Sequence, residues 1–416
     1  MTPGVLAQVR SFDRSVQLLL LNQFTINVGF YMLMPYLAQH LSGELALAGW
    51  LVGLILGVRN FSQQGMFLVG GTLADRFGYK PLIVAGCTLR TVGFLALGFV
   101  DSVPALLAAS AASGFAGALF NPAVRAYVAR DAGERRVEAF ALFNVFYQAG
   151  ILAGPLVGLA LTGVDFRLTC LVAAVVFAVL TLVQIRSLPQ ARDRGVSASD
   201  PEPVARQWRR VLGNRSFLLF AASMTGSYVL SFQVYLALPL VLRESTGNRT
   251  VATIGASALF GVSALATILG QTRVTTWCKR RWRPDRAIAW GLVLMGAAFL
   301  PMLTPVGTTA AVVLCGLLLA LATMIIYPFE MNTIVALAGE RLVATHYGLY
   351  NTICGIGIAA GNLLTGAALD AAGKAGVPGL PWLSLAALGL ACAGAVHSLG
   401  RTGRLNVVRP EPVPAT

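Results

Sequence analysis

Three charged side chains interrupt long apolar runs of this 416-residue sequence. Arg59 and Arg90 fall in the second and third runs, and Glu330 falls in the tenth, within YPFEMN. A charge at the centre of a bilayer costs about 2.5–3.5 kcal/mol on insertion scales, so such a residue is a functional candidate by default. A carboxylate held away from water can carry a proton, and a guanidinium can hold an anion through charge-assisted hydrogen bonds.

Each of these charges has more than one interpretation. Glu330 is a proton- or substrate-binding carboxylate, the structural partner of an arginine, or a residue exposed near the cytoplasmic end of its helix. Arg59 can organise an anionic substrate, pair with Glu330 or brace a gate, whereas a structural role is favoured for Arg90. Arg125 and Arg273 stand near the ends of apolar runs, so we expect their long side chains to reach water there.

Two polar stripes at helical spacing add candidates for a binding surface. A polar stripe in a bilayer should face the interior of a helix bundle or a cavity. Methionine and aromatic neighbours would then form an adaptable wall, although the stripes can also serve only as hydrogen bonds between helices. The candidates for a substrate cavity are Asn22, Gln23, Asn27 and Tyr31 in the first run, Arg59 in the second, and Ser227, Ser231 and Tyr235 in the seventh.

The apolar runs predict an all-α integral membrane protein. The sequence is 56% hydrophobic and 12% charged, with a mean hydropathy of +0.72, whereas soluble domains are about 25% charged. Its 44 glycines suit the close packing of helices in a bilayer. Because about 20 apolar residues cross a bilayer, the sequence predicts twelve transmembrane helices at 15–39, 48–74, 80–100, 104–128, 138–162, 166–186, 216–241, 251–277, 286–306, 308–338, 346–372 and 379–399.

A long polar stretch divides these helices into two halves. Residues 187–214 are rich in Pro, Ser and charge, which is typical of a linker. The halves resemble each other, since ALFNVFYQAGILAGPL in the fifth helix parallels GLYNTICGIGIAAGNL in the eleventh. Duplicated halves in parallel orientation place a substrate path between them, near the bilayer midplane. The predicted organisation is a cytoplasmic N-terminus at 1–14, a six-helix half at 15–186, a cytoplasmic linker at 187–214, a six-helix half at 215–399 and a cytoplasmic tail at 400–416.

The basic residues predict the orientation of the chain in the membrane. A net charge of +14 could indicate a nucleic-acid partner. However, most of the 31 Lys and Arg residues gather in short loops on the side that carries both termini, which is the pattern of membrane topology. We therefore expect no nucleic acid, a lipid bilayer as the main partner, and a multi-pass protein of the plasma (inner) membrane with both termini in the cytoplasm. The opposite side holds only Arg167, Arg243, Arg249 and Lys374.

A cluster of glycines and charges, GGTLADRFGYKP at 70–81, joins the second and third helices. Gly71 and Gly78 remove side chains where backbones come close. Asp75 can accept hydrogen bonds from the N-terminus of a neighbouring helix, where the helix dipole favours an anion. Such a cluster would hold helices together in one conformation and release them in another.

The same cluster carries two basic residues. Arg76 and Lys80 are expected to pair with carboxylates of the next cytoplasmic loop, Asp131 or Glu134. These pairs would strengthen the contact that Asp75 makes.

These residues resemble the signature loop of the major facilitator superfamily, G-x-L-A-D-R-x-G-x-K-P, across 71–81. A second signature of that superfamily, G-x-x-x-G-P-x-x-G, matches Gly150, Gly154, Pro155 and Gly158 in the fifth helix. In the superfamily this second signature marks proton-coupled exporters, and simple helix packing by glycines is its alternative explanation. Both motifs stand in the helices where the resemblance requires them.

A narrower resemblance is to multidrug-resistance members of the superfamily. It is carried by the segment 59–65, Arg90, FNPAVR at 120–125 and VDFRL at 164–168, and it weakens in the C-terminal half. The resemblance implies a secondary transporter of the drug:proton antiporter group, whose halves rock around a central site. It implies a small-molecule substrate and protons as partners, a monomer, and the proton gradient in place of any cofactor, with Glu330 as the candidate coupling residue.

Several features depart from that pattern. The first helix offers Asn22, Gln23 and Asn27 where many drug exporters carry an acid, and Ser110 stands where many members carry an arginine. Uptake or facilitated diffusion of a small metabolite therefore stays an alternative to export, and two arginines against one glutamate favour a neutral or anionic cargo. The sequence has no nucleotide-binding loop, metal-ligand pattern or hydrolase constellation, so neither an enzyme nor a metal site is expected.

Overall fold

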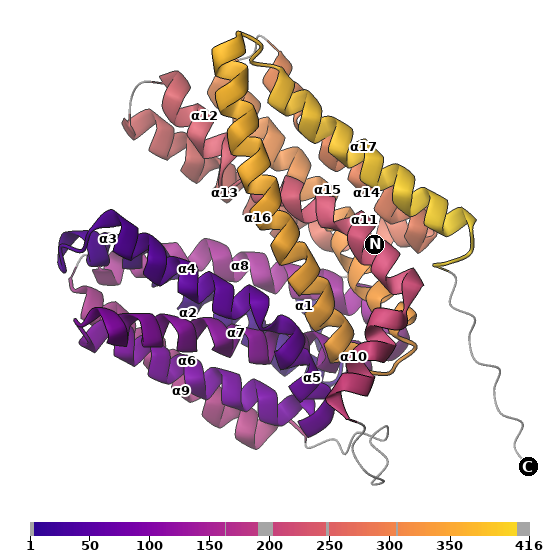
Figure 1. Ribbon diagram of the computed structural model, residues 1–416. Helices are drawn as coiled ribbons and strands as arrows, with labels where there is room; N and C mark the ends of the chain where they lie inside the picture. Colours follow the sequence, from indigo (N-terminus) through magenta and orange to yellow (C-terminus); the bar gives the residue numbers. More distant parts are fainter. Residues whose placement is uncertain (1–3, 163, 190–202, 247–248, 305–306, 406–416) are drawn as a thin grey trace, which may run out of the picture.

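The structure of the protein, a computed structural model, describes residues 4–162, 164–189, 203–246, 249–304 and 307–405. Within these residues the chain forms helices and no strand, as the apolar runs predict. The N-terminal half (indigo to magenta in Figure 1) contains α1 (Val5–Arg10), α2 (Arg14–Tyr31), α3 (Met34–Gly43), α4 (Gly49–Gly65), α5 (Phe67–Phe77), α6 (Tyr79–Phe99), α7 (Val103–Ala132), the 3-10 turn η1 (Gly133–Arg135), α8 (Arg136–Thr162) and α9 (Phe166–Ser187).

The C-terminal half follows a short helix, α10 (Val204–Gly213), that the sequence does not predict. This helix forms because Val204, Trp208 and Val211 recur at the spacing of one helical face. The indole N–H of Trp208 donates to the Thr72 hydroxyl on α5 at 2.9 Å, so α10 is held against the N-terminal half. The half itself contains α11 (Arg215–Phe232), α12 (Ala237–Thr246), α13 (Arg249–Arg281), α14 (Pro284–Ala297), the 3-10 turn η2 (Leu300–Leu303), α15 (Thr308–Ala338), α16 (Val343–Ala375) and α17 (Leu380–Arg401).

The prediction of twelve membrane-crossing helices in two halves of six is confirmed. Among the described residues, ten segments are long and apolar enough to cross a membrane, and one of them, Val103–Thr162, contains both α7 and α8. The predicted second helix is split into α4 and α5, of 17 and 11 residues, so neither is long enough alone. Counting α7 and α8 separately adds one span, and counting α4 with α5 as one crossing adds another. The described residues therefore contain twelve spans.

The first helix of each half is interrupted at the same place. In the N-terminal half, α2 ends at Tyr31 and α3 begins at Met34. In the C-terminal half, α11 ends at Phe232 and α12 begins at Ala237, which leaves Tyr235 in the break. The sequence predicts these as continuous helices, and the matching breaks support the duplication of the halves.

The fourth helix of each half is long and contains a proline. Helix α7 has Pro122 inside it, and α15 has Pro328. Proline lacks the N–H that a helix interior uses and bends the helix locally. Each proline is followed within three residues by a charge, Arg125 in α7 and Glu330 in α15.

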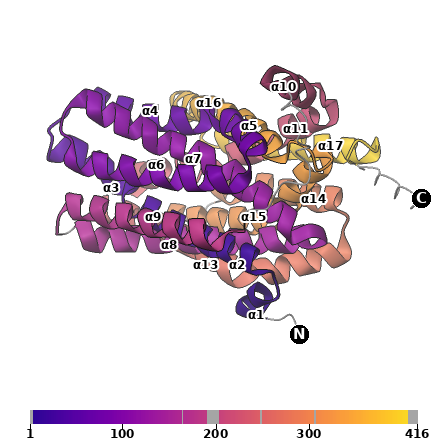
Figure 2. The ribbon, with the colours of Figure 1, turned by 90° about the horizontal axis from the view of Figure 1, so that it is seen from below.

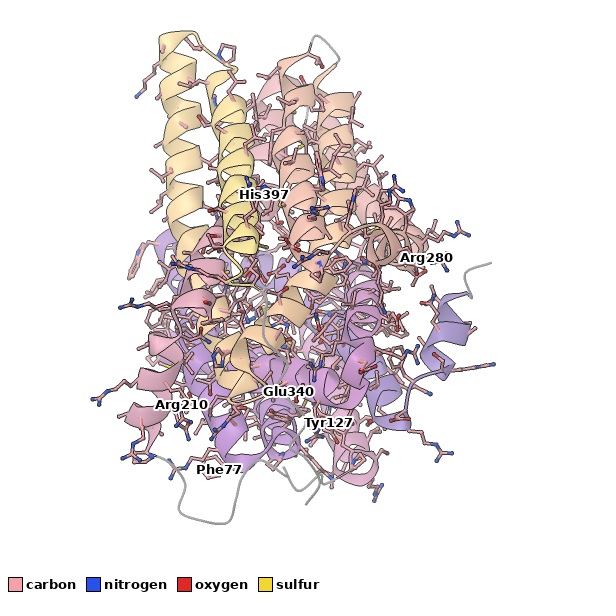
Figure 3. The ribbon with its side chains drawn as sticks, turned by 90° about the vertical axis from the view of Figure 1, so that its right-hand side faces the viewer. Phe77, Tyr127, Arg210, Arg280, Glu340 and His397 are labelled. Atoms are coloured by element: carbon pink, nitrogen blue, oxygen red, sulfur yellow. The ribbon has the colours of Figure 1, made fainter. Side chains whose placement is uncertain are left out.

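The two halves meet at one end of the molecule. Helix α5 packs against α16, and α8 packs against α13 and α15. Figure 1 shows α5, α10 and α16 together at this end, while α3 and α12 lie well apart at the other. Viewed from below in Figure 2, α5 and α16 again lie side by side. Figure 3 shows Phe77 and Glu340 near the contact between the halves. We call this the closed end.

Candidate functional site

Asp75 joins the two halves at the closed end. Its Oδ1 accepts the backbone N–H of Ala344 at 3.1 Å, and its Oδ2 accepts the backbone N–H and the hydroxyl of Thr345, both at 2.7 Å. These groups lie in the first turn of α16, where backbone N–H groups lack helical partners and the dipole favours an anion. The predicted hydrogen bonding of Asp75 to a helix N-terminus is confirmed, and that helix belongs to the opposite half.

Lys80 binds a different partner from the one predicted. Its Nζ donates to the backbone oxygens of Ile185 at 2.8 Å and Leu188 at 2.7 Å, at the end of α9. The last carbonyls of a helix lack partners and carry partial negative charge, so they attract an ammonium group. The expected pairing of Lys80 with Asp131 or Glu134 is therefore wrong.

The predicted pairing of Arg76 is also wrong. Its side chain is exposed, and its guanidinium carbon lies 5.8 Å from the centre of the Phe77 ring. Asp131 instead pairs with its neighbour Arg130, Nε to Oδ1, at 2.9 Å. Because Arg130 and Asp131 are adjacent in the chain, their side chains can pair without bringing another segment close. The Asp131 carboxylate therefore already has a basic partner.

Further polar contacts cross between the halves, and three of them join pairs of side chains. Two involve partly exposed ion pairs, each of which contributes about 1 kcal/mol or less. The third is a buried pair of side-chain amides. The contacts are Arg136 with Glu340 at 2.6 Å, Lys279 with Glu138 at 2.8 Å, and Asn144 with Gln271 at 2.8 Å.

Glycines let the halves come this close. A Cβ on Gly71 would lie 2.1 Å from the backbone oxygen of Ala344, and one on Gly348 would lie 2.3 Å from that of Phe67. Gly78 ends α5 with a φ of +92°, a conformation that other residues rarely adopt. The predicted need for glycine at 71 and 78 thus has a direct structural cause.

The glycine-proline motif of α8 packs within the N-terminal half. Gly150, Gly154 and Gly158 lie where α8 meets α2 and the start of α3, and the hydroxyl of Tyr36 donates to the backbone oxygen of Pro155 at 2.7 Å. A Cβ added to the first of these glycines would lie 2.6 Å from Asn27. One added to the second would lie 2.7 Å from Tyr31, and one added to the third would lie 2.1 Å from Met32. The motif brings Tyr31 close to α8.

Glu330 is buried between helices, eight residues before the end of α15 at Ala338. Its side chain is 3% exposed, and its Oε1 accepts the hydroxyl of Tyr350 from α16. Tyr228 of α11 approaches the same carboxylate, and Arg125 of the opposite half interacts with it electrostatically. The interpretation of Glu330 as exposed is therefore wrong.

Arg125 also lies inside, against our expectation that it reaches water. It precedes the end of α7 at Ala132 by seven residues, about 10 Å along the axis. Its guanidinium interacts electrostatically with Tyr327 and Tyr228 of the C-terminal half and with Tyr147 of its own half. Among the described residues, its Nε and Nη1 atoms are buried and have no hydrogen-bond partner.

A second group of interacting side chains adjoins the group around Glu330 and Arg125. Tyr31 interacts with Tyr147 of α8 and with Tyr235 of the C-terminal half, and Arg59 of α4 interacts with Tyr31. Tyr235 is 51% exposed although it lies between the halves. Arg59, Arg125, Tyr31, Tyr147, Tyr228 and Tyr327 are each partly exposed as well. Because these side chains interact across the two halves, their exposure indicates an accessible space between them.

Arg59 and Arg90 share one aromatic ring. Their guanidinium carbons lie 4.9 and 5.1 Å from the centre of the Phe30 ring. Arg90 is 2% exposed and donates to the backbone oxygen of Ser113 at 3.2 Å, so it packs within the N-terminal half. We call Arg59, Arg125, Glu330 and the tyrosines 31, 147, 228, 235, 327 and 350 the central cluster.

The other predicted residues of the first helix lie within the N-terminal half. Asn22 accepts a hydrogen bond from Gln184 of α9 at 2.6 Å, and Asn27 donates to the backbone oxygen of Gln23 at 2.9 Å. All three predicted residues are buried. The structure therefore uses Asn22 and Asn27 in helix packing, the alternative that the sequence left open.

The predicted serines of the seventh helix lie within the C-terminal half. Ser227 donates to the backbone oxygen of Met224 at 2.7 Å, and Ser231 contacts the sulfur of Met295 at 3.8 Å. Neither of these contacts involves the central cluster. Of the predicted cavity residues, the structure brings together Tyr31, Arg59 and Tyr235.

Comparison with known protein families identifies the family of this chain. Residues 19–362 match the Major Facilitator Superfamily. The chain is a member of the major facilitator superfamily. It is a multi-pass membrane transporter, since that is what the members of this superfamily are.

Individual relatives span the whole chain. An uncharacterized MFS-type transporter of Mycobacterium tuberculosis, Rv0849, is 51% identical over 404 residues, 95% of this chain and 96% of that one. The multidrug resistance protein MdtH of Yersinia enterocolitica is 30% identical over 400 residues, 93% and 94% of the two chains. The resemblance to multidrug-resistance members is thus confirmed, and it extends through the C-terminal half, where the motifs alone show little.

Solved structures share the fold. The Escherichia coli fucose:proton symporter FucP has a TM-score of 0.73 at 14% identity, over 92% of this chain and 98% of that one. The human organic anion transporter MFSD10 has a TM-score of 0.74 at 15% identity, over 92% and 99%. At such low identity the likeness concerns the fold alone.

Proposed function

We propose that this transporter is proton-coupled and moves small amphipathic molecules through the central cluster by alternating access. Likeness to MdtH and the glycine-proline motif of α8 favour export as its direction. The proton gradient then supplies the energy, no cofactor is needed, and a monomer suffices because one chain contributes both halves. The positive-inside pattern supports a plasma-membrane protein with both termini, and the closed end, in the cytoplasm.

The observation that carries this proposal is Glu330 at the contact of the two halves. It stands on a proline-containing helix of one half and faces Arg125 on the equivalent helix of the other. A carboxylate there gains or loses its charge with a proton, and this changes its attraction to Arg125. Proton binding is thereby linked to the arrangement of the halves.

The closed end supplies the other requirement of alternating access. Its contacts combine close helix packing with polar contacts that depend on one arrangement of the halves, and Asp75 at the N-terminus of α16 makes three of the hydrogen bonds. Opening would replace these bonds by water, at a modest cost for exposed ion pairs. We propose that Gly71, Asp75 and Gly78 stabilise the conformation closed to the cytoplasm.

Energised inside-out vesicles with a pH-sensitive dye test the proposal. A panel of lipophilic cations, neutral amphipathic compounds and organic anions is added to wild type and to Glu330→Gln. We expect at least one compound to collapse the pH gradient in wild type and to have no effect in Glu330→Gln. Glu244→Gln, on an exposed residue of α12, is the matched control and should behave as wild type.

Two outcomes would count against the proposal. Equal proton movement in Glu330→Gln and wild type would remove Glu330 as the coupling residue. A panel that moves no protons in either direction would remove proton coupling itself. Size-exclusion profiles of the purified variants show whether a loss reflects misfolding.

Uptake of a small organic anion is the second candidate. It is favoured by the excess of arginine in the interior: Arg59, Arg90 and Arg125 against Glu330. The first helix also lacks the acid that many exporters carry. The sign of the proton movement separates this candidate from export.

A further inference from the structure

Two guanidinium groups of the N-terminal half contact one aromatic ring, and the described residues place no carboxylate against either of them. Arg59 and Arg90 repel each other electrostatically, and no carboxylate is among the groups that act on either of them. Both guanidinium carbons lie about 5 Å from the centre of the Phe30 ring, and Arg90 also donates to the backbone oxygen of Ser113. Buried like charges of this kind are costly unless something of opposite charge joins them.

The same arginines carry N–H groups that nothing in the described chain accepts. Arg59 Nη1 and Arg90 Nε are buried and lack a partner, as do Nε and Nη1 of Arg125. An unpaired buried donor loses its bonds to water without replacement, and the penalty is larger for charged groups. Three of these atoms belong to Arg59 and Arg125 of the central cluster, which indicates that the site is completed by an acceptor from outside.

The protein does not supply that acceptor from its own carboxylate. Glu330 interacts with Arg125 but accepts its hydrogen bond from Tyr350. No ion pair joins Arg125 to Glu330 among the contacts of the described residues. With two arginines, Arg59 and Arg125, to one glutamate, the central cluster keeps one positive charge when Glu330 is ionised.

The tyrosines connect the arginines into one site. Arg59 interacts with Tyr31, Tyr31 with Tyr147, and Tyr147 with Arg125. Tyr235 closes this row from the C-terminal half. Phenol rings offer apolar faces to an aromatic ligand and hydroxyl groups to its polar end.

We propose that the central cluster binds an organic anion, a carboxylate on an aromatic or similarly flat apolar body, with Arg59 and Arg125 as the residues that hold its charge. Arg90 acts through Arg59 and Phe30 and is a positioning residue. The inference rests on transport through the central cluster, as proposed above, but not on the direction of that transport. Arginine suits this task because its planar donors match a carboxylate.

Binding of a matched probe set to the purified full chain in lipid nanodiscs tests this inference. Naphthoate, naphthamide and naphthylmethylamine share one ring system and differ in charge. By isothermal titration calorimetry, we expect naphthoate to bind at least about tenfold more tightly than naphthamide, and naphthylmethylamine to bind most weakly, because charge-assisted hydrogen bonds are the strong ones. This order follows from the positive charge of the centre.

Arginine variants give the decisive comparison. Arg59→Gln and Arg125→Gln should each weaken naphthoate by about tenfold to a hundredfold, the range for a lost charge-assisted bond, and leave naphthamide unchanged. Arg273→Gln, on an exposed residue of α13, is the control and should match wild type. If a glutamine variant does not fold, Arg125→Lys or Arg59→Lys keeps the charge and should give an intermediate loss.

Three results would overturn the inference: no naphthoate binding, tighter binding of naphthylmethylamine, or equal losses for all probes in the arginine variants. Failure of the proposed function gives a different result. Naphthoate binding through Arg59 and Arg125 without proton movement in vesicles keeps the anion site and removes proton coupling. Proton movement that only neutral or cationic compounds cause would keep proton coupling and remove the anion site.

Discussion

Gly71 determines how closely the two halves approach, because its missing side chain leaves room for the backbone of Ala344. A Cβ there would lie 2.1 Å from the Ala344 oxygen, far inside contact distance. Overpacking typically costs about 1–3 kcal/mol, which corresponds to roughly a 5- to 150-fold loss of the closed arrangement. We therefore expect Gly71→Ala to fold normally and to transport more slowly, as measured by initial rates in vesicles.

A second glycine of the same predicted helix is the control. Gly57 of α4 has open space around it, so Gly57→Ala should keep the wild-type rate. If both variants transport equally fast, the close contact between Gly71 and Ala344 does not form during the transport cycle. A Gly71→Ala variant that merely fails to reach the membrane would be recognised by its reduced amount.

Single residues also show where sequence reasoning stops. The apolar setting of Glu330 and Arg59 could be predicted, since each stands alone in a long hydrophobic run. Arg125 could not, because the end of α7 at Ala132 is hidden by AYVARDA, which mixes apolar and charged residues. Proline at 122 was the available signal, since it mirrors Pro328 before Glu330.

The predicted polar stripes illustrate a different limit. Spacing shows that Asn27 shares a face with Tyr31 and that Ser227 shares a face with Tyr235, but not whether a partner in the same half already occupies their side chains. Each of the two side chains donates to a backbone oxygen of its own helix. Such bonds depend on the rotamer of each side chain, which is not encoded in the spacing of one helix.

Among the elements, α16 is held at its N-terminus by one carboxylate. Asp75 accepts three hydrogen bonds there, from the backbone of Ala344 and Thr345 and from the Thr345 hydroxyl. Asp75→Asn keeps an acceptor but loses the charge that the helix end favours. We expect this variant to destabilise the closed end by about 1–2 kcal/mol, so that open conformations become roughly 5- to 30-fold more populated.

Spin labels across the closed end measure this shift. Phe77→Cys at the end of α5 and Arg341→Cys before α16 replace exposed residues, and the six native cysteines are buried. Distances between the labels should lengthen in Asp75→Asn and stay unchanged in Asp101→Asn, whose side chain is 63% exposed at the other end of α6. An unchanged distance distribution in Asp75→Asn would contradict this role of the carboxylate.

The helices themselves were predictable, and their interruptions were not. Apolar runs locate membrane helices because the bilayer demands about 20 apolar residues. The breaks after Tyr31, at Met66 and around Tyr235 lie within such runs, so hydropathy does not reveal them. They become intelligible only in the assembled halves, where Tyr31 and Tyr235 meet.

At the scale of the whole molecule, the charges at the centre determine how protons and cargo are coupled. A proton on Glu330 removes the negative charge that faces Arg125. An anion would then find Arg125 without its competitor, so the proton and the anion favour each other's binding, and the coupling is reciprocal. A neutral or cationic cargo gains nothing from that proton. Anions should therefore travel together with protons, whereas exported compounds of other charge should exchange against them.

The direction of proton movement in one vesicle preparation distinguishes the two cases. In weakly buffered, right-side-out vesicles without a gradient, an external pulse of naphthoate should make the medium more alkaline, because each anion takes a proton inward. This cotransport of one anion with one proton carries no net charge, so a membrane potential set with potassium and valinomycin should leave its rate unchanged, although each uncompensated charge would respond by about 2.3 kcal/mol per 100 mV. A neutral or cationic exported compound should acidify the same medium, and Glu330→Gln should abolish both signals. Acidification by naphthoate would show that anion and proton exclude each other, which is incompatible with Glu330 and the anion acting on Arg125 in the way the central cluster implies.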